Sequence, residues 1–439
     1  MKIPQAARAL RSGNYRLFVC GQAVSLIGTW MQMIAQSWLI YRLTNSAVLL
    51  GLAGFMAQIP VFVLAPLGGV IADRLDRRRV LIVAQSAMML LALVLATLTF
   101  TETVQVWHIL SLATLLGVAN AFDIPARQSF VIEMVRREDL PNAIALNASM
   151  VNAARLVGPA VAGAIVAAAG EAWCFLINGA SYAGVITALV FMRLPGAAVR
   201  VAATVSAWAS VVEGFLFAWQ TRPVRALLLL VGLVSLMGMP YSVLMPIFAD
   251  RVLGGGPNAY GFLMSAAGLG ALGGSSVLTL RRDLRGLGRW IAISASGFGV
   301  SLILFSFSRS LWLSGGLLVS TGFFMILGMA ASNTLIQAMV PDRLRGRIMA
   351  VYSMMFMGMA PMGALMAGSL AEPVGAPATV AVGGAVCLLG GLLFGARLPA
   401  LRGPARQLIA AQQMAAGAPP DEVQPVHVFG SPGTAGRPR

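Results

Sequence analysis

Three charged side chains fall inside long apolar stretches of the sequence, where a charge is costly and therefore informative. Asp123 and Arg127 share one stretch and are four residues apart, so on a helix they lie one turn apart and can form an ion pair. Arg155 lies in the next apolar stretch. A buried carboxylate can take up and release a proton, and the arginines can hold a charged solute. A static ion pair that locks two helices together explains the same residues, and the sequence leaves both roles open.

Helix geometry places these charges at a common depth. At about 1.5 Å per residue, counted from the charged ends of their stretches, Asp123 lies about 18 Å and Arg155 about 21 Å from one membrane surface. We therefore expect these two side chains to meet across neighbouring helices. Gln32 and Asn333 add polar groups to two further stretches, where hydrogen bonds between helices explain them as well as a bound solute does.

A second cluster of charges lies in the segment Gly69-Val-Ile-Ala-Asp73-Arg74-Leu-Asp76-Arg77-Arg78-Arg79. The apolar segments on either side, roughly residues 46–72 and 78–101, are each long enough to cross a bilayer, which takes about 20 apolar residues. The charges therefore fall in a short loop at a membrane surface. The simplest interpretation is a loop that orients the chain by its positive charge.

The composition requires a membrane protein. Of 439 residues, 58% are hydrophobic and 10% are charged, which is too apolar for a soluble chain of this size. The net charge of +16 does not indicate nucleic-acid binding, because the arginines occur in short clusters between apolar runs. Two histidines and three cysteines without a paired spacing leave no material for a metal site or a catalytic triad. We expect no cofactor, no metal and no enzymatic activity.

Apolar runs separated by charges or turn residues predict an all-α integral membrane protein with twelve transmembrane helices. The expected division is an N-terminal six-helix half (1–193), a cytoplasmic linker with an amphipathic helix near 204–220 on the membrane surface (194–222), a C-terminal six-helix half (223–398) and a disordered cytoplasmic tail (399–439). The expected spans are residues 15–40, 46–72, 78–101, 106–135, 141–169, 173–193, 223–249, 258–281, 289–308, 312–340, 346–370 and 376–397.

The positive charges predict the orientation of these spans. Of the 31 lysines and arginines, 26 fall in the tails and in alternate loops, three in the loops on the other side and two inside spans. Loops rich in lysine and arginine stay on the cytoplasmic side. We therefore expect a multi-pass protein of the bacterial inner membrane with both termini in the cytoplasm.

The two halves repeat at a shift of 205 positions. Gly69 falls on Gly274 and Met134 on Met339, each pair near the end of a span. Together with six spans on each side, such matches suggest a duplication into pseudo-symmetric halves with a site between them.

Span five also contains Gly158-Pro159, followed by Gly163. Small residues beside a proline allow close packing of helices and a hinge. The motif resembles the Gly-Pro signature in helix five of exporters of the major facilitator superfamily, with Ala154 and Ala162 in place of two of its glycines.

The resemblance extends from Asn14 to Leu398. The segments DIPARQSFVIEMV and LPNAIALNASMVNAARLVGPAVAG, within residues 123–163, resemble the branch of that superfamily with the enterobactin exporter and bacterial multidrug and macrolide efflux proteins. The resemblance implies the twelve-helix major facilitator fold, in which the loop after span two latches the halves as the carrier alternates.

For that latch, the resemblance implies a role for each loop residue. Asp73 would accept hydrogen bonds at the N-terminal end of span eleven, and Arg74 and Arg77 would pair with neighbouring acids. Gly69 would permit the close approach. Asp76 stands where the superfamily pattern has glycine.

We therefore predict a secondary active transporter that exports a small amphipathic molecule, drug-like or siderophore-like, by alternating access with proton antiport. No GxxxxGK[ST] phosphate loop is present, so a gradient supplies the work. The expected partners are the small-molecule substrate, protons and membrane lipid, with no nucleic acid, and the chain acts as a monomer. An importer or facilitator, or a non-transporting sensor on the same scaffold, remains the alternative. The predicted coupling and cavity residues are Asp123, Arg127, Arg155, Gln32 and Asn333; the gate residues are Gly69, Asp73, Arg74 and Arg77; the hinge is Gly158 and Pro159.

Overall fold

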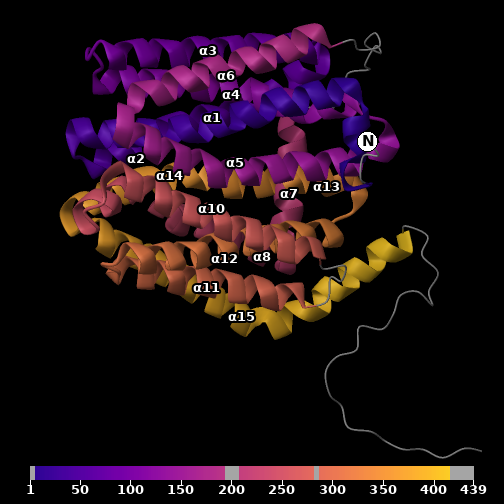
Figure 1. Ribbon diagram of the computed structural model, residues 1–439. Coiled ribbons are helices and arrows are strands. Elements are labelled where there is room, and N and C mark those ends of the chain that lie inside the picture. Colours follow the sequence, from indigo (N-terminus) through magenta and orange to yellow (C-terminus); the bar gives the residue numbers. More distant parts are fainter. Residues whose placement is uncertain (1–4, 193–206, 281–285, 416–439) are drawn as a thin grey trace, which may run out of the picture.

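The computed structural model describes residues 5–192, 207–280 and 286–415, and the regular elements in those ranges are all helical. Twelve of the helical segments are long and apolar enough to cross a membrane. Figure 1 shows them side by side in two groups, the N-terminal half in indigo to magenta and the C-terminal half in pink through orange to yellow. The prediction of twelve transmembrane helices in two six-helix halves is confirmed.

The first half consists of six uninterrupted spans that run alternately between the two ends of the molecule, preceded by a short 3-10 helix, Gln5–Arg11. We call the end where α2 meets α3 and α4 meets α5 the basic end, and the other the opposite end. The spans are α1 (Gly13–Thr44), α2 (Ala47–Arg74), α3 (Arg77–Phe100), α4 (Val106–Met134), α5 (Leu140–Ala169) and α6 (Glu171–Phe191).

The second half differs in that two of its spans are interrupted. Span seven is α8 (Arg222–Leu233), a π-helical turn (Val234–Gly238), a 3-10 turn (Met239–Ser242), α9 (Met245–Ile247) and a second π-helical turn (Phe248–Val252). Span eleven is α13 (Asp342–Ser353), a π-helical turn (Met354–Gly358) and α14 (Met359–Val374). The uninterrupted spans are α10 (Gly256–Leu280), α11 (Leu287–Phe307), α12 (Leu311–Met339) and α15 (Ala376–Ala415).

Turns between spans are set by residues that cap helices or accept a left-handed backbone. Asn45, with φ 52°, closes α1, and Ser46 caps α2 through a hydrogen bond from the Leu49 amide. Asp76 is extended, with φ −62° and ψ 110°, and its side chain accepts a hydrogen bond from the Arg78 amide at the start of α3. This turn therefore needs no glycine, which explains why an aspartate fits where the superfamily pattern has one.

The duplication predicted from the sequence is visible in the element bounds. Helix α4 covers Val106–Met134 and α12 covers Leu311–Met339, so both ends of the pair are offset by the predicted 205 positions. Gly170 closes α5 with φ 90°, and Gly375, 205 positions later, closes α14 with φ 87°. Both glycines need a positive φ that other residues rarely adopt.

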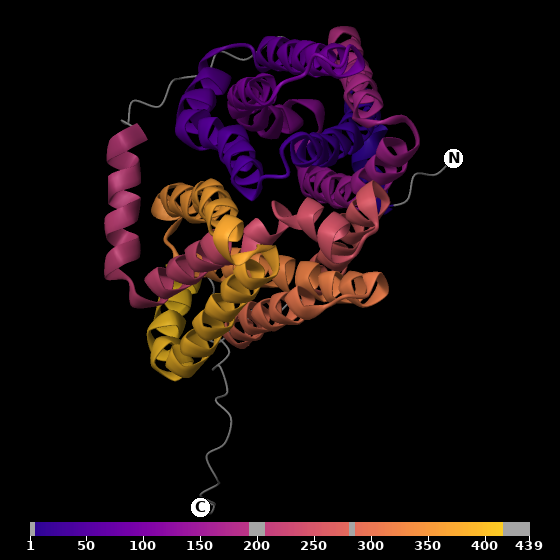
Figure 2. The same cartoon turned by 90° about the vertical axis from the view of Figure 1, so that its left-hand side faces the viewer.

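Close contacts between the halves lie at the opposite end, the end that faces the viewer in Figure 2. A Cβ on Gly51 of α2 would lie 3.0 Å from the Cα of Gly368 in α14, and one on Gly163 of α5 would lie 3.0 Å from the Cα of Gly261 in α10. These glycines allow two close helix crossings. Hydrogen bonds join the halves at this end too, for example from Tyr41 to Asp250, 2.8 Å long.

The same end carries further polar links. The Ala47 amide donates to the Glu372 carboxylate over 3.2 Å, and Arg251 donates to the carbonyl oxygen of Asn45 over 3.2 Å. At the basic end, no hydrogen bond or ion pair between described residues joins the halves. In the described part of the chain, hydrogen bonds and close glycine crossings therefore fasten the halves at the opposite end.

The helix α7 (Ala207–Gln220) lies within the predicted linker and crosses the direction of the spans (Figure 1). Its Glu213 pairs with Arg347 and Arg343 of α13, the latter at 3.6 Å, and Gly214 packs against the Arg347 backbone. The other face exposes Val212, Phe215, Leu216 and Trp219. The predicted amphipathic helix is present, with one face bound to the second half.

One prediction about the chain's end is wrong. Residues 399–415, which we expected to be disordered, continue α15 to Ala415. Leu401, Ala405, Leu408 and Ile409 recur at helical spacing and pack against the hydrophobic core of the second half. That apolar stripe, which the alanine, glycine and proline content hides, is the reason that the helix continues. Residues 416–439 lie outside the described part.

Candidate functional site

Asp123 lies in the interior of the first half, between helices and away from the second half. Its side chain is 3% exposed, and each carboxylate oxygen has a partner. Gln85 of α3 donates to Oδ1 over 2.8 Å, and Arg127, one turn along α4, pairs with Oδ2 at 3.3 Å. The predicted pair of Asp123 and Arg127 is therefore formed, with Gln85 as a partner that the sequence analysis missed.

A second set of hydrogen bonds lies next to this pair and joins α1 to α6. The side-chain amide of Asn178 in α6 donates a hydrogen bond to the side-chain oxygen of Gln32 over 2.6 Å, and the hydroxyl oxygens of Tyr182 and Thr29 are 3.5 Å apart. Gln32, one of the predicted cavity residues, is buried. The hydrogen bond from Asn178 therefore explains the presence of Gln32 in an apolar span without a bound solute.

Arg155 on α5 has a different environment from Asp123. Its Nε and Nη1 atoms are buried and have no hydrogen-bond partner. Its guanidinium lies over the ring of Trp30 in α1, 5.1 Å from the centroid, which is a cation–π contact. Tyr241, from span seven of the other half, is near enough to interact with it electrostatically.

The two charges that we expected to meet are therefore separate. Asp123 faces α3 and pairs with Arg127, whereas Arg155 faces α1 and the second half, and the two do not form an ion pair. The expectation rested on depth alone. Depth follows from residue counting, but the direction in which a side chain points is set by helix rotation, which packing decides.

Asn333 is the predicted site residue of the second half. It lies half-buried on α12 and accepts a hydrogen bond of 2.5 Å from Gln337, one turn further along the same helix. This bond is local to α12. The described contacts thus leave Asn333 without a link to Asp123, Arg127 or Arg155.

The gate residues lie at the basic end, where Arg77 is the centre of their contacts. Arg77 pairs with Asp73 at 3.1 Å and with Glu133 of α4 at 3.2 Å, and it donates to the carbonyl oxygens of Ala72 and Ser129. Its side chain is 10% exposed. Arg77 thus ties α2, α3 and α4 together within the first half.

The other gate residues are open to their surroundings in this conformation. The Asp73 side chain is 69% exposed and pairs with Arg77, and in the described first turn of α13 Asp342 pairs with Arg345. Arg74 is exposed, and a Cβ on Gly69 would meet nothing within 4 Å. The neighbouring Gly68 makes a close approach instead, against the backbone of Ala121 in α4.

The Gly158-Pro159 motif makes two close contacts. A Cβ on Gly158 would lie 3.0 Å from the carbonyl oxygen of Ile27 and would meet Trp30, so this glycine lets α1 approach α5. The carbonyl of Pro159 faces Gly261 of the second half. The motif thus seats Trp30 beside Arg155 and lies at the crossing that joins the halves.

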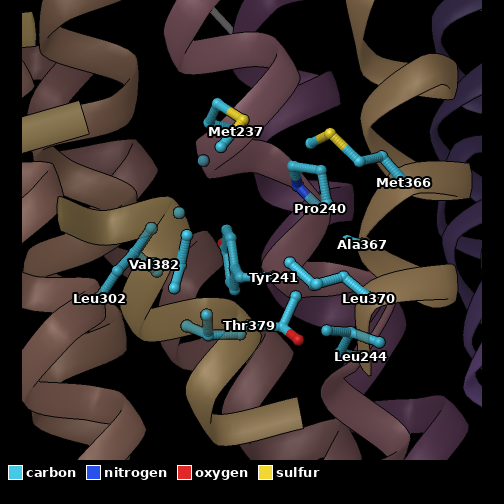
Figure 3. A pocket seen from close by; sticks show the side chains of 13 residues that line it. Met237, Pro240, Tyr241, Leu244, Leu302, Met366, Ala367, Leu370, Thr379 and Val382 are labelled. Atoms are coloured by element: carbon cyan, nitrogen blue, oxygen red, sulfur yellow. The ribbon is translucent and has the colours of Figure 1, made fainter. Parts of the chain in front are cut away.

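One small, mostly apolar cavity lies beside span seven. It lies inside the second half (Figure 3), has a volume of about 20 Å³ and is lined by Tyr241, Met237 and Met366 among others. That volume is about the size needed for one water molecule. Among the described residues, no three His, Cys, Asp or Glu side chains are arranged to hold a metal ion. The charged side chains within the described spans, Asp123, Arg127 and Arg155, are therefore the candidates for the functional chemistry.

Comparisons with known proteins agree on one class. The family model described as "Transmembrane secretion effector" matches residues 6–424. The chain is 24% identical to the staphyloferrin A transporter of Staphylococcus aureus over 84% of this chain and 92% of that protein. It is 28% identical to the multidrug efflux pump Tap of Mycolicibacterium fortuitum over 80% of this chain and 88% of that one. A crystal structure of a POT family transporter with bound 5-aminolevulinic acid matches with a TM-score of 0.70 and 13% identity, over 88% of this chain and 96% of the other.

Proposed function

The chain belongs to the transmembrane secretion effector family of the major facilitator superfamily, a family of transporters and not of enzymes, and from this premise we propose that it exports a small amphipathic molecule in exchange for protons. The relatives named for siderophore transport and drug efflux support export over import.

One observation carries the alternating-access part of the proposal: among the described residues, hydrogen bonds and close glycine crossings join the halves at the opposite end, and no hydrogen bond or ion pair joins them at the basic end. Alternating access requires a second conformation with the reverse arrangement. The exposed carboxylate of Asp73 then reaches the N-terminal end of α13, where the helix dipole favours a negative charge. Gly69, which is uncrowded now, becomes the point of close approach.

The interrupted spans of the second half supply the flexibility for that change. The π-helical turn Met354–Gly358 separates α13 from α14, and a similar turn, Val234–Gly238, ends α8. Such turns lack the regular hydrogen bonding of an α-helix and often occur at functional sites. The basic part of span eleven can therefore move toward Asp73 while α14 keeps its contact with α2.

Asp123 is the proposed proton carrier. It is the carboxylate buried in the middle of the described spans, and the other described span acids lie at helix ends. Protonation removes its charge, which releases Arg127 while the hydrogen bond from Gln85 can remain. The competing role is a static pair that only fastens α3 to α4.

The basic end is the proposed cytoplasmic end, because loops rich in arginine stay inside. The chain is then a multi-pass protein of the bacterial cell membrane with its N-terminus and the end of α15 in the cytoplasm. We propose that one chain, surrounded by lipid, is the transporting unit.

Efflux from a bacterial host that lacks its own efflux pumps tests the proposal. Cells expressing the wild type or Asp123→Asn are loaded with ethidium, erythromycin or staphyloferrin A, with and without a protonophore. We expect at least one compound to leave wild-type cells rapidly and to be retained with the protonophore or with the variant. Uptake into inverted vesicles separates export from import. Efflux that persists in Asp123→Asn at normal protein levels contradicts the role of Asp123.

A further inference from the structure

The charges in the middle of the described spans do not balance. Asp123 and Arg127 neutralise each other, and Arg155 remains as a further cation. The other described acids of the spans are engaged elsewhere: Glu171 pairs with Arg42, Asp250 accepts from Tyr41 and Glu372 accepts from the Ala47 amide. No described carboxylate lies within ion-pair distance of Arg155.

An unpaired guanidinium at this depth is unfavourable. Insertion scales put the cost of an arginine near a helix centre at about 2.5–3.5 kcal/mol, and such residues usually pair with another group. Here Nε carries one N–H donor and Nη1 carries two, and both atoms are buried without an acceptor. The Trp30 ring offsets part of this cost, but a ring face cannot accept all of these hydrogen bonds.

Arg155 lies at the interface between the two halves. The backbone of Arg155 packs directly against α10 of the other half, since a Cβ on Gly268 would lie 2.7 Å from its carbonyl oxygen. Trp30 of α1 lies over the guanidinium. Arg155 thus lies where α1, α5 and α10 meet, and two nitrogens of its guanidinium lack a hydrogen-bond acceptor.

We propose that Arg155 binds an anionic group of the substrate and that the transported class is amphipathic carboxylates; this inference rests on the proposed transport function. The carboxylate accepts the free N–H groups of Arg155, and the apolar or aromatic body of the solute packs beside Trp30. Gly158 supports the site, because it allows Trp30 to reach the guanidinium. Asp123 and Arg127 keep the proposed role in proton exchange.

A matched pair of fluorescent probes tests this assignment directly. Dansyl-phenylalanine carries a carboxylate, and dansyl-phenylalaninamide has the same body without the charge. Binding of each probe is titrated to the purified protein in lipid nanodiscs, with empty nanodiscs as the blank, for the wild type, Arg155→Gln and Arg155→Lys. Arg251→Gln is the control, because Arg251 also lies over an aromatic ring, that of Tyr41, but at the exposed opposite end.

We expect the wild type to bind the carboxylate about tenfold or more tightly than the amide, as a charged hydrogen bond predicts. Arg155→Gln removes this preference, Arg155→Lys retains part of it because the charge stays while the planar fork is lost, and Arg251→Gln keeps it. Equal affinities in the wild type, no binding of the carboxylate, or an unchanged preference in Arg155→Gln overturns the inference.

A second measurement needs no probe. Removing an unpaired buried cation relieves a cost, so ligand-free Arg155→Gln should have a Tm equal to or above that of the wild type. A Tm several degrees lower shows that Arg155 already has a protein partner and overturns the inference.

Binding requires no gradient, so a carboxylate preference without proton-driven export refutes the proton exchange alone. Driven export of acid and amide at equal rates refutes the carboxylate site alone.

Discussion

The two halves of this transporter have the same architecture but different interiors. Asp123 of α4 corresponds, at the offset of 205, to Gly328 of α12, and Arg127 corresponds to Ser332. The ion pair of the first half is thus replaced by a local bond, from the Ser332 hydroxyl to the Gly328 carbonyl, 2.8 Å long. Arg155 likewise corresponds to Ala360.

The contrast separates two tasks. Two glycine crossings fasten the opposite end: α5 packs on α10, and its symmetry equivalent α14 packs on α2. Both halves therefore contribute equally to closing this end. The charges occur in the first half alone. The second half contributes interrupted spans and methionines such as Met355 and Met359 beside Gly232, a pliable apolar wall. We infer that the first half carries the proton coupling and that the interrupted spans of the second half provide the conformational change.

The largest expected effect concerns the buried charges. Asp123→Asn should reduce gradient-driven efflux by more than about tenfold, because the amide cannot exchange a proton. Ser332→Ala, which removes the hydroxyl at the matched position of the second half, should leave efflux within about twofold. Efflux rates normalised to protein in the membrane measure both. Equal losses in the two variants refute the division of tasks.

Closure should respond to substitution in the same way in both halves. A Cβ on Gly163 would lie 2.8 Å from the Pro257 carbonyl, and one on Gly368 would lie 2.9 Å from Gly51. Gly163→Val and Gly368→Val should each lower transport about fivefold by keeping the opposite end from closing.

The control for the closure variants is Gly184→Val in α6, where a Cβ meets nothing within 4 Å. Efflux and the amount of protein in the membrane are measured for all three. If only one of the two crossing variants is impaired, closure is not shared by the halves.

A smaller effect is expected at the gate. Asp73 has Leu278 in the equivalent place of the second half, so the proposed latch would have no counterpart there. Asp73→Asn should slow turnover about threefold through a weaker interaction with the end of α13, while the protein level stays normal. Leu278→Met should change turnover little. Transport and protein level falling together in Asp73→Asn would mean that Asp73 serves folding.

The smallest effect concerns a feature that the first half lacks. Helix α6 ends at Phe191, whereas α15 continues well beyond the equivalent position to Ala415 and packs Leu408 against the core. Leu408→Ala should reduce the free energy of unfolding by about 1–2 kcal/mol, which is typical of a partly buried leucine. Gln407→Ala, on the exposed side, is the control. Thermal unfolding in detergent measures both, and equal stabilities would mean that the extension is not held by this contact.

The sequence predicted the spans well because each is an apolar run ended by charges or turn residues. The expected span 106–135 matches α4, for example, to one residue. The interrupted spans seven and eleven were not predicted, since the apolar pattern does not distinguish an α-turn from a π-turn. The extension of α15 was missed because the alanine, glycine and proline content of the tail hides its sparse apolar stripe.

Site geometry was harder to predict for a physical reason. Residue counting gave the depths of Asp123 and Arg155 but not the rotation of α4 and α5, so their partners, Gln85 and Trp30, were not foreseen. A lone glutamine in an apolar stretch is the signal that could have indicated Gln85. For the gate, the pairing of Arg77 with neighbouring acids was predictable, because those acids lie within a turn or at the facing helix end.

The most direct test of the central claim separates proton coupling from substrate movement in one preparation. Proteoliposomes containing wild type or Asp123→Asn are loaded with the compound that wild-type cells export, and its accumulation under an imposed pH gradient is compared with its exchange without a gradient. The account predicts that Asp123→Asn loses driven accumulation but retains exchange. Driven accumulation that survives in Asp123→Asn would contradict it.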